Sequence, residues 1–219
     1  MKSSPIQKHF DKVAKGYDSG KQKYSFYYGN LKKLLSSEIP LNSKVCEIGC
    51  GTGDLLSHLQ PKFGYGMDVS GEMIKRAKKK HKLKKNLKFS ASWPNNKFDY
   101  VFMSDVVEHL DNPQETFNQI SKLMNKNSVF INTMANPIWE PLLMFWEKMG
   151  WKMKEGPHSR IDINELKVMM KKNGLKIIKH DYKLLVPIYI PVVTELANKY
   201  LEKPFKKFSF IEYLVAVRS

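Results

Sequence analysis

A short glycine-rich stretch restricts the fold of this chain more than any other feature. An apolar run meets three glycines in alternate positions, in the order Val45-Cys46-Glu47-Ile48-Gly49-Cys50-Gly51-Thr52-Gly53. Glycines spaced in this way let the chain turn sharply from a strand into a helix and bring bare backbone against a ligand. We therefore expect a strand, a binding turn and a helix that begins near Thr52.

The spacing of the glycines differs from that of a dinucleotide site. In the G-x-G-x-x-G pattern the third glycine would follow Gly53 by one residue. Here an acidic residue, Glu47, stands two positions before Gly49, which favours a ligand with a cationic group over a diphosphate. Asp68 follows a second apolar run, where it can accept hydrogen bonds from ribose hydroxyls. The two carboxylates predict a site for an amine-bearing nucleoside and disfavour a nicotinamide oxidoreductase.

Short apolar runs alternate with helical patterns along most of the chain, which predicts βαβ units and a parallel sheet. We expect strands at 44–48, 65–69, 87–91, 98–104, 129–133, 175–185 and 208–217. The expected helices are 52–59, a helix that Ser70 caps, 113–124 and 163–172. Three regions fall outside this alternation: 1–40, an aromatic insertion at 136–160, and a second insertion at 186–207, which contains prolines and is flanked by lysines. Residues 184–193 are expected to form the end of a strand and an apolar loop.

The net charge is the first sign of a macromolecular partner. The chain has 219 residues, and 37 Lys plus Arg against 21 Asp plus Glu give a net charge of +16. Such an excess favours a polyanion such as RNA. However, only Arg76, Arg160 and Arg218 are arginines, and nucleic-acid readers favour the bidentate guanidinium. The densest lysine run, 75–88, is therefore interpreted as a solvated helix face, and RNA is a less favoured partner.

Several classes of protein are disfavoured by the remaining composition. The N-terminus lacks the apolar run of a signal peptide, and the stretch 184–194 is too short to span a bilayer. Residues 184–193, flanked by Lys183 and Lys199, could at most make a weak peripheral membrane contact. Cys46 and Cys50 fit neither a disulfide framework nor a zinc site. We expect a cytoplasmic protein without a transmembrane segment.

Three motifs, in this order and spacing, carry a resemblance to a known family. They are Val45 to Leu56; Gly66 to Ser70 with Met73, Ile74 and Ala77; and Phe98 to Val101 leading to Val107 to Leu110. On these residues the chain resembles the class I S-adenosylmethionine-dependent methyltransferases from about Phe10 to its end. The resemblance implies an α/β fold: a Rossmann-like, doubly wound, mostly parallel seven-stranded sheet with an antiparallel last strand. It also implies one domain, 1–219, with an N-terminal helical cover at 1–40 and cap insertions at 136–160 and 186–207.

The resemblance implies S-adenosylmethionine as the cofactor and a set of residues that hold it. The glycine turn with Glu47 would line the methionine part, Asp68 would hold the ribose, and Val69 and Met73 would flank the adenine. The family often places an aspartate after the third strand to read the adenine, whereas this chain offers Ser92 or backbone groups there. The full set is Tyr17, Glu47, Gly49, Cys50, Gly51, Gly53, Asp68, Val69, Met73, Ser92, Ser104 and Asp105.

A general base is required only if the acceptor loses a proton during attack. His109, one helical turn past the strand tip that bears Asp105, is the first candidate, and His158 in the insertion is the second. Asp105, Glu108 and His109 also resemble the metal site of RNA 2′-O-methyltransferases, which His158 could complete. Because the first position is Asp rather than Glu, we expect no metal.

The sequence therefore predicts an enzyme that transfers a methyl group from S-adenosylmethionine to oxygen, nitrogen or carbon of a small-molecule acceptor. The aromatic insertion suggests that this acceptor is hydrophobic, lipid-linked or a sugar. An RNA methyltransferase and a cofactor-binding partner subunit without activity remain the alternatives.

Overall fold

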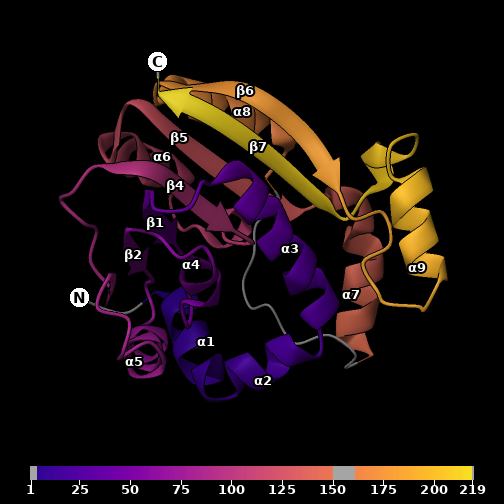
Figure 1. The fold of residues 1–219 in the computed structure, drawn as a ribbon, viewed down its shortest axis with the longest axis horizontal. Helices are drawn as coiled ribbons and strands as arrows, with labels where there is room; N and C mark the ends of the chain where they lie inside the picture. The colour runs from indigo at the N-terminus through magenta and orange to yellow at the C-terminus, as the bar shows by residue number, and fades with distance from the viewer. Residues whose placement is uncertain (1–3, 150–160, 219) are drawn as a thin grey trace.

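The computed structural model describes residues 4–149 and 161–218. In these ranges seven strands form one sheet in the order β3-β2-β1-β4-β5-β7-β6, with helices on both faces (Figure 1). The first five strands pair in parallel, and β7 lies antiparallel to both β5 and β6. The strands are β1 (Lys44–Ile48), β2 (Phe63–Met67), β3 (Leu87–Ser90), β4 (Phe98–Ser104), β5 (Met124–Ala135), β6 (Leu175–Lys183) and β7 (Ile211–Arg218).

Helices precede the sheet and connect its strands. The longer helices are α1 (Pro5–Val13), α2 (Tyr17–Gln22), α3 (Ser25–Glu38), α4 (Asp54–His58), α5 (Gly71–Lys80), α6 (Pro113–Lys122), α7 (Glu140–Lys148) and α8 (Ile163–Lys172). The short α9 (Val193–Leu196) continues into a π-helical turn, η4 (Ala197–Leu201). Single 3₁₀ turns are η1 (Ala14–Gly16), η2 (Val107–His109), η3 (Pro137–Trp139) and η5 (Lys206–Phe208).

Two apolar layers bury the sheet. On one face Leu35 of α3 and Leu56 of α4 pack with Phe102 of β4 in a single buried cluster. On the other face Phe117 of α6 packs against Phe130 of β5, in a cluster that also contains side chains of α8. Because strands of a parallel sheet are covered on both faces, they are nearly continuous apolar runs, as the sequence of β4 shows.

Side-chain caps fix where several helices begin. Ser70 accepts a hydrogen bond from the Met73 backbone N–H at the start of α5. The side chains of Asn112 and Asp162 cap α6 and α8 in the same manner. Each cap satisfies a backbone donor that the first helical turn leaves without a partner. The caps place the residues just before these helices at defined points beside the strand ends.

The predicted Rossmann-like sheet and its antiparallel last strand are confirmed, and several predicted segments differ from the structure in their bounds. The last strand begins at Ile211 rather than at 208, because Lys206–Phe208 form a 3₁₀ turn. The second strand is Phe63–Met67 rather than 65–69, because the Asp68 side chain accepts from the Gly51 N–H of the glycine turn and from the Ser70 N–H, where the chain leaves the sheet. The fifth strand is longer than 129–133, since its antiparallel pairing with β7 continues to Ala135. Finally, the expected apolar loop at 184–193 is followed directly by helical structure, since α9 begins at Val193 and continues into η4. No helix in the described ranges is long and apolar enough to cross a membrane.

We predict that Phe130→Ala lowers the free energy of unfolding by about 3–5 kcal/mol, because it opens a cavity in the core. Phe130 has 0% exposure and packs edge-on against Phe117, with the ring centroids 6.0 Å apart. Urea unfolding followed by circular dichroism measures the change. Leu83→Ala, at a side chain that is 86% exposed, is the matched control and should change stability by less than about 0.5 kcal/mol.

Candidate active site

A cavity of about 490 Å³ lies at the carboxyl ends of the parallel strands. Its floor comes from the residues that end or follow β1, β2 and β4, namely Ile48, Gly49, Met67, Asp68, Ser104 and Asp105. Helices α1 to α3 line it on one side, and α7 with residues 187–188 on another. In open α/β sheets this edge is where ligands bind.

The glycine turn brings the backbone close to the cavity. Gly49, Gly51 and Gly53 all have positive φ, of 72°, 51° and 79°. A Cβ on Gly51 would stand 3.1 Å from the Tyr17 ring, so the absence of a side chain leaves the gap between turn and ring open. Only glycine takes this conformation without strain and without closing that gap.

Glu47 is a buried carboxylate at the end of β1 that lines the cavity. One of its oxygens accepts a hydrogen bond from the Leu56 backbone N–H at 3.1 Å. Burial raises the pKa of Glu47 to about 8, and nearby Lys21 and the Leu56 bond oppose this shift. A cation that enters the cavity would stabilise the ionised form of this side chain.

Asp68 joins the ends of the first two strands. Its carboxylate accepts hydrogen bonds from the Gly51 N–H at 2.7 Å and the Ser70 N–H at 2.9 Å. Burial raises the pKa of Asp68, and these two bonds lower it. A carboxylate has about four lone-pair positions, so both oxygens keep acceptor capacity toward the cavity.

The helices α1 and α2 cover the cavity and are held to the elements beneath them by two aspartates. Asp11 accepts hydrogen bonds from the Ser70 hydroxyl at 2.6 Å and the Glu72 N–H at 3.2 Å. Asp18 accepts from the Thr52 hydroxyl at 2.6 Å and from Lys80 at 2.9 Å. The cover is therefore fixed to the glycine turn and to the start of α5.

Lys21 is a site residue that the sequence did not reveal. Its Nζ lies 4.2 Å from the Tyr28 ring centroid and 5.0 Å from that of Tyr17. Burial lowers the pKa of Lys21, while the carboxylates of Glu47 and Asp54 oppose the shift. Lys21 thus lines the same cavity as the carboxylates of Glu47, Asp68 and Asp105.

At the tip of β4 the structure joins Asp105 to Tyr27. The Tyr27 hydroxyl donates to both carboxylate oxygens of Asp105, at 2.8 Å each. Asp105 has a φ of 54°, which is uncommon for a residue other than glycine and occurs at functional sites. Burial and the Asp105 carboxylate raise the pKa of Tyr27, so the phenol stays protonated and continues to donate.

Beyond Asp105 the cavity becomes apolar. Aromatic and aliphatic side chains from α3, α7, the 187–188 stretch and the start of β7 form this part, which we call the apolar half. They are Tyr24, Tyr27, Leu143, Trp146, Pro187, Ile188 and Phe210. The opposite part, around Glu47 and Asp68, is polar, so the cavity combines a site for a polar ligand with a site for an apolar one.

Of the two histidines predicted as candidate bases, the structure describes only His109. His109 lines the cavity and packs edge-on against Phe10, with the ring centroids 5.5 Å apart. His158 lies outside the described residues. Within the described ranges no group of three His, Cys, Asp or Glu side chains is arranged to hold a metal ion.

The structure brings most of the predicted cofactor residues to this one cavity. The lining includes Tyr17, Glu47, Gly49, Cys50, Gly51, Asp68, Val69, Met73, Ser104 and Asp105. Gly53 is absent from the lining because the space at its Cα is filled by Phe89, 2.5 Å from a hypothetical Cβ. Ser92 is absent too, since its carbonyl accepts from the Tyr65 hydroxyl, and the neighbouring Trp93 lines the cavity in its place.

Comparisons with known proteins identify the family of the chain and proteins with the same fold. A family model described as "Methyltransferase domain" matches residues 21–180. The chain is 32% identical over 171 residues to a ubiquinone biosynthesis O-methyltransferase of Pelagibacter ubique, across 68% of each chain. It shares its fold with the methyltransferase of a Haloferax volcanii complex with the activator Trm112, at TM-score 0.72, 18% identity and coverage of 95% and 97%. The N-methyltransferase NodS of Bradyrhizobium japonicum, solved with S-adenosyl-L-homocysteine, gives TM-score 0.67, 12% identity and coverage of 98% and 99%.

We predict that Glu47 makes the ligand-free protein less stable as pH rises from about 4.5 to 8. Its pKa in the folded protein, about 8, exceeds the ordinary value of 4.5, so the native state binds more protons than the unfolded state in this window. The contribution of Glu47 to the free energy of unfolding is therefore largest below about pH 4.5 and falls steadily as the pH rises to 8. Urea unfolding between pH 5 and 8 should give a flatter profile for Glu47→Gln. Glu72→Gln, at an exposed carboxylate, should keep the wild-type profile, and a Glu47→Gln profile equal to wild type would contradict the prediction.

Proposed function

The chain belongs to the S-adenosylmethionine-dependent methyltransferases, and from that premise we propose that it methylates a hydroxyl group of a small, apolar acceptor. The observation that supports this most strongly is the division of one cavity into a polar half at Glu47 and Asp68 and an apolar half beyond Asp105. The O-methyltransferase named for the Pelagibacter relative supports oxygen as the acceptor atom.

The polar half fits S-adenosylmethionine. It offers two buried carboxylates, Glu47 and Asp68, to a ligand that carries an ammonium group and ribose hydroxyls. The turn at Gly51 leaves a gap against Tyr17 that a Cβ would close. Val69, Met73 and Trp93 supply the apolar surface that an adenine ring needs.

We assign the cofactor contacts as follows. Glu47 and the glycine turn hold the amino end of the methionine part, and Asp68 accepts from the ribose. Lys21, whose ammonium group faces the cavity between Tyr17 and Tyr28, pairs with the carboxylate of the methionine part. The cofactor supplies a methyl group on a sulfonium, which is an excellent leaving group.

Positioning is the main contribution of the chain to the reaction. Orientation of two reactants can supply roughly 7–11 kcal/mol of the acceleration. Helices α1 and α2, held by Asp11 and Asp18, exclude water from the reacting atoms. The apolar half holds the acceptor body, so its hydroxyl lies beside Asp105.

Removal of the acceptor proton requires a base at the boundary between the halves. Tyr27 holds the Asp105 carboxylate in one orientation at that boundary. We place Asp105 as the group that orients the acceptor hydroxyl, and His109 on the cavity wall as the base that receives its proton. His158 stays a prediction.

We also propose that 1–219 acts as one domain in which the N-terminal cover closes the cofactor side and the segments near α7 and α9 close the acceptor side. Figure 1 shows the lysine-rich α5 and α7 on opposite sides of the molecule, so the lysine run lies away from the acceptor half. This arrangement supports a small-molecule acceptor over RNA.

An amine acceptor is the second candidate. A neighbouring hollow of about 670 Å³ shares Glu108, Ala135 and Leu143 with the first cavity. Its other lining residues include Glu140, Glu147, Asp162, Glu165 and Glu212. Carboxylates around the end of an apolar pocket would favour a substrate with a cationic group.

We predict that Lys21→Met weakens the binding of S-adenosylmethionine roughly tenfold or more, because a hydrogen bond to a charged group is lost. Decarboxylated S-adenosylmethionine, which lacks the partner of Lys21, should bind wild type and variant almost equally. Isothermal titration calorimetry measures both ligands. Lys23→Met, at an exposed neighbour, is the control. An equal loss of affinity for both ligands would show that Lys21 does not contact the cofactor carboxylate.

We predict that alkylated catechols accept labelled methyl from S-adenosylmethionine. Burial of each added methylene in the apolar half should contribute about 0.8 kcal/mol, so kcat/KM should rise about fourfold per methylene. Trp146→Ala should weaken this dependence by raising KM. Asp105→Asn should lower kcat while cofactor binding is retained. Matched alkyl amines and RNA are parallel substrates in the same assay. Label in the amines would select the second candidate, and label in RNA alone would overturn both.

A further inference from the structure

The segment between β6 and β7, residues 184–208, carries an unusual amount of exposed apolar surface. Ten of the nineteen exposed large hydrophobic side chains in the described part of the chain lie here: Ile188, Tyr189, Ile190, Val192, Val193, Leu196, Tyr200, Leu201, Phe205 and Phe208. Single exposed apolar residues are normal, but a concentrated group marks a surface that contacts another apolar phase.

The helical part of this segment, α9 with η4, has its polarity inverted. Thr194 is fully buried, and its hydroxyl donates to the Ile188 carbonyl at 2.8 Å and accepts from the Ile190 N–H at 2.8 Å. Four residues on, Asn198 bonds both the N–H and the carbonyl of Val186, at 2.9 and 3.2 Å. Two polar side chains of this helix, Thr194 and Asn198, thus face the protein, while Glu195 and Lys199 are exposed.

The apolar positions of the same helix face outward. Val193, Leu196 and Tyr200 are 56%, 50% and 62% exposed. A surface helix of a water-soluble protein normally turns its apolar stripe to the core and its polar side to solvent. The reversed arrangement is expected where the outer face meets an apolar environment.

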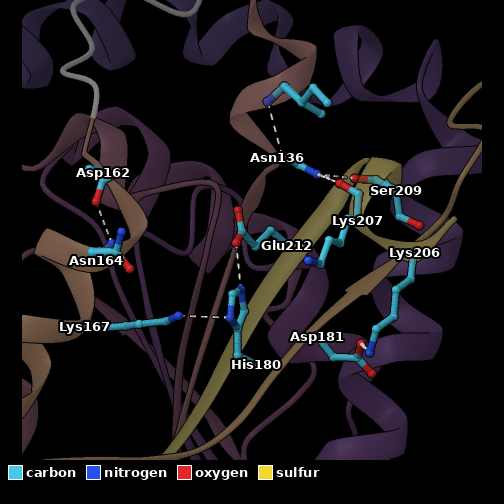
Figure 2. A network of polar contacts seen from close by, with 11 residues as sticks. Asn136, Asp162, Asn164, Lys167, His180, Asp181, Lys206, Lys207, Ser209 and Glu212 are labelled. Carbon is cyan, nitrogen blue, oxygen red and sulfur yellow. Dashed lines mark hydrogen bonds and ion pairs between the residues drawn. The ribbon is translucent and has the colours of Figure 1, made fainter.

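The segment is firmly attached at both of its ends. Glu202 accepts from the Leu184 N–H at 2.7 Å and from Lys183 at 3.0 Å. Figure 2 shows Asn136 beside Lys207 and Ser209, whose carbonyls accept from its side-chain amide at 2.9 Å each. The exposed face is therefore presented in a defined position rather than on a loose loop.

The surroundings of the exposed face are basic. Lys199, Lys203, Lys206 and Lys207 are exposed within the segment, and Lys206 pairs with Asp181 at 3.0 Å. Of the two acids in the segment, Glu202 is turned inward, so Glu195 is the exposed one. Apolar residues flanked by lysines match an anionic lipid surface, where the apolar part enters the headgroup region and the lysines contact the phosphates.

We propose that residues 184–208 dock the protein onto the surface of an anionic lipid bilayer, with Val193, Leu196 and Tyr200 in the interface. Pro187 and Ile188 of the same segment line the apolar half of the cavity, so docking places the acceptor site next to the membrane. In Figure 1, α9 lies at the margin of the molecule beyond the end of β6, where a flat surface can reach it. The sequence allowed at most a weak contact through 184–193, whereas the exposed apolar face in the structure extends over α9 and η4. The inference concerns binding, so it is tested without reference to methyl transfer.

The test is flotation of the purified full chain with vesicles of phosphatidylcholine that contain phosphatidylglycerol at about one lipid in three. Wild type should float with these vesicles at low salt and much less with pure phosphatidylcholine or at high salt. Leu196→Glu with Tyr200→Glu should lower the partition coefficient at least tenfold. The control pair Leu83→Glu and Ile178→Glu, at side chains 86% and 57% exposed elsewhere, should stay within about twofold of wild type.

A second pair of variants tests whether binding depends on the lysines of this segment or only on the net charge of the protein. Lys199→Glu with Lys203→Glu should lower anionic-vesicle binding by roughly fivefold or more per lysine. Lys82→Glu with Lys85→Glu makes the same charge change in the densest lysine run and should have a smaller effect. Calorimetric binding of S-adenosylhomocysteine verifies that each variant is folded.

Absence of wild-type flotation at low salt, or equal loss of binding in the control pairs, would overturn the proposal. A wild-type dimer in sedimentation that Leu196→Glu dissociates would assign the surface to a second copy instead.

Discussion

The bond between the Asp68 carboxylate and the Gly51 N–H, 2.7 Å long, is the interaction on which the rest of the site depends. It joins the turn after β1 to the end of β2, and it requires the positive φ of Gly51. The same carboxylate accepts from the Ser70 N–H, and the Ser70 hydroxyl donates to Asp11 of the N-terminal cover. One buried side chain thus sets the distance between the two strand ends and determines where the cover attaches.

The charges of the molecule are segregated, although its net charge is +16. The carboxylates Glu47, Asp68 and Asp105 line the cavity, and Lys21 is the cation beside them. Burial raises the pKa of Glu47 and lowers that of Lys21, so both are poised to respond to a charged ligand. The lysine run of α5, in contrast, lies on an exposed helix face. The large positive charge therefore describes the surface and says little about the chemistry inside.

Local signals made much of the fold predictable. The cap at Ser70 and the helix 163–172 could be identified from the sequence because their determinants lie within a few residues. Lys21 could not, because one lysine among many acquires meaning only when α2 brings it against Tyr28 and the carboxylates. The helix α9 was missed for a different reason: its apolar residues face outward, and Pro187 and Pro191 suggested a loop. The sequence also could not show that Trp93, rather than the neighbouring Ser92, lines the cavity, because this depends on how the chain folds after β3.

The two sides of the cavity are closed by different kinds of interaction, and this difference bears on how the two ligands enter. The proposed cofactor side is covered through polar contacts, in which Asp11 accepts from the Ser70 hydroxyl and Asp18 from the Thr52 hydroxyl, and hydrogen bonds of this kind can be exchanged for bonds to water. The proposed acceptor side is lined by apolar side chains, such as Trp146 and Ile188, next to a segment whose outer face is apolar as well. A polar cofactor from solution and an apolar acceptor from a lipid phase would each meet a surface of matching polarity. In the described part of the chain the hydrogen bonds of Asp11 and Asp18 join the cover to Ser70, Glu72, Thr52 and Lys80. Under the proposed function, acceptors would therefore exchange while the cofactor stays under its cover.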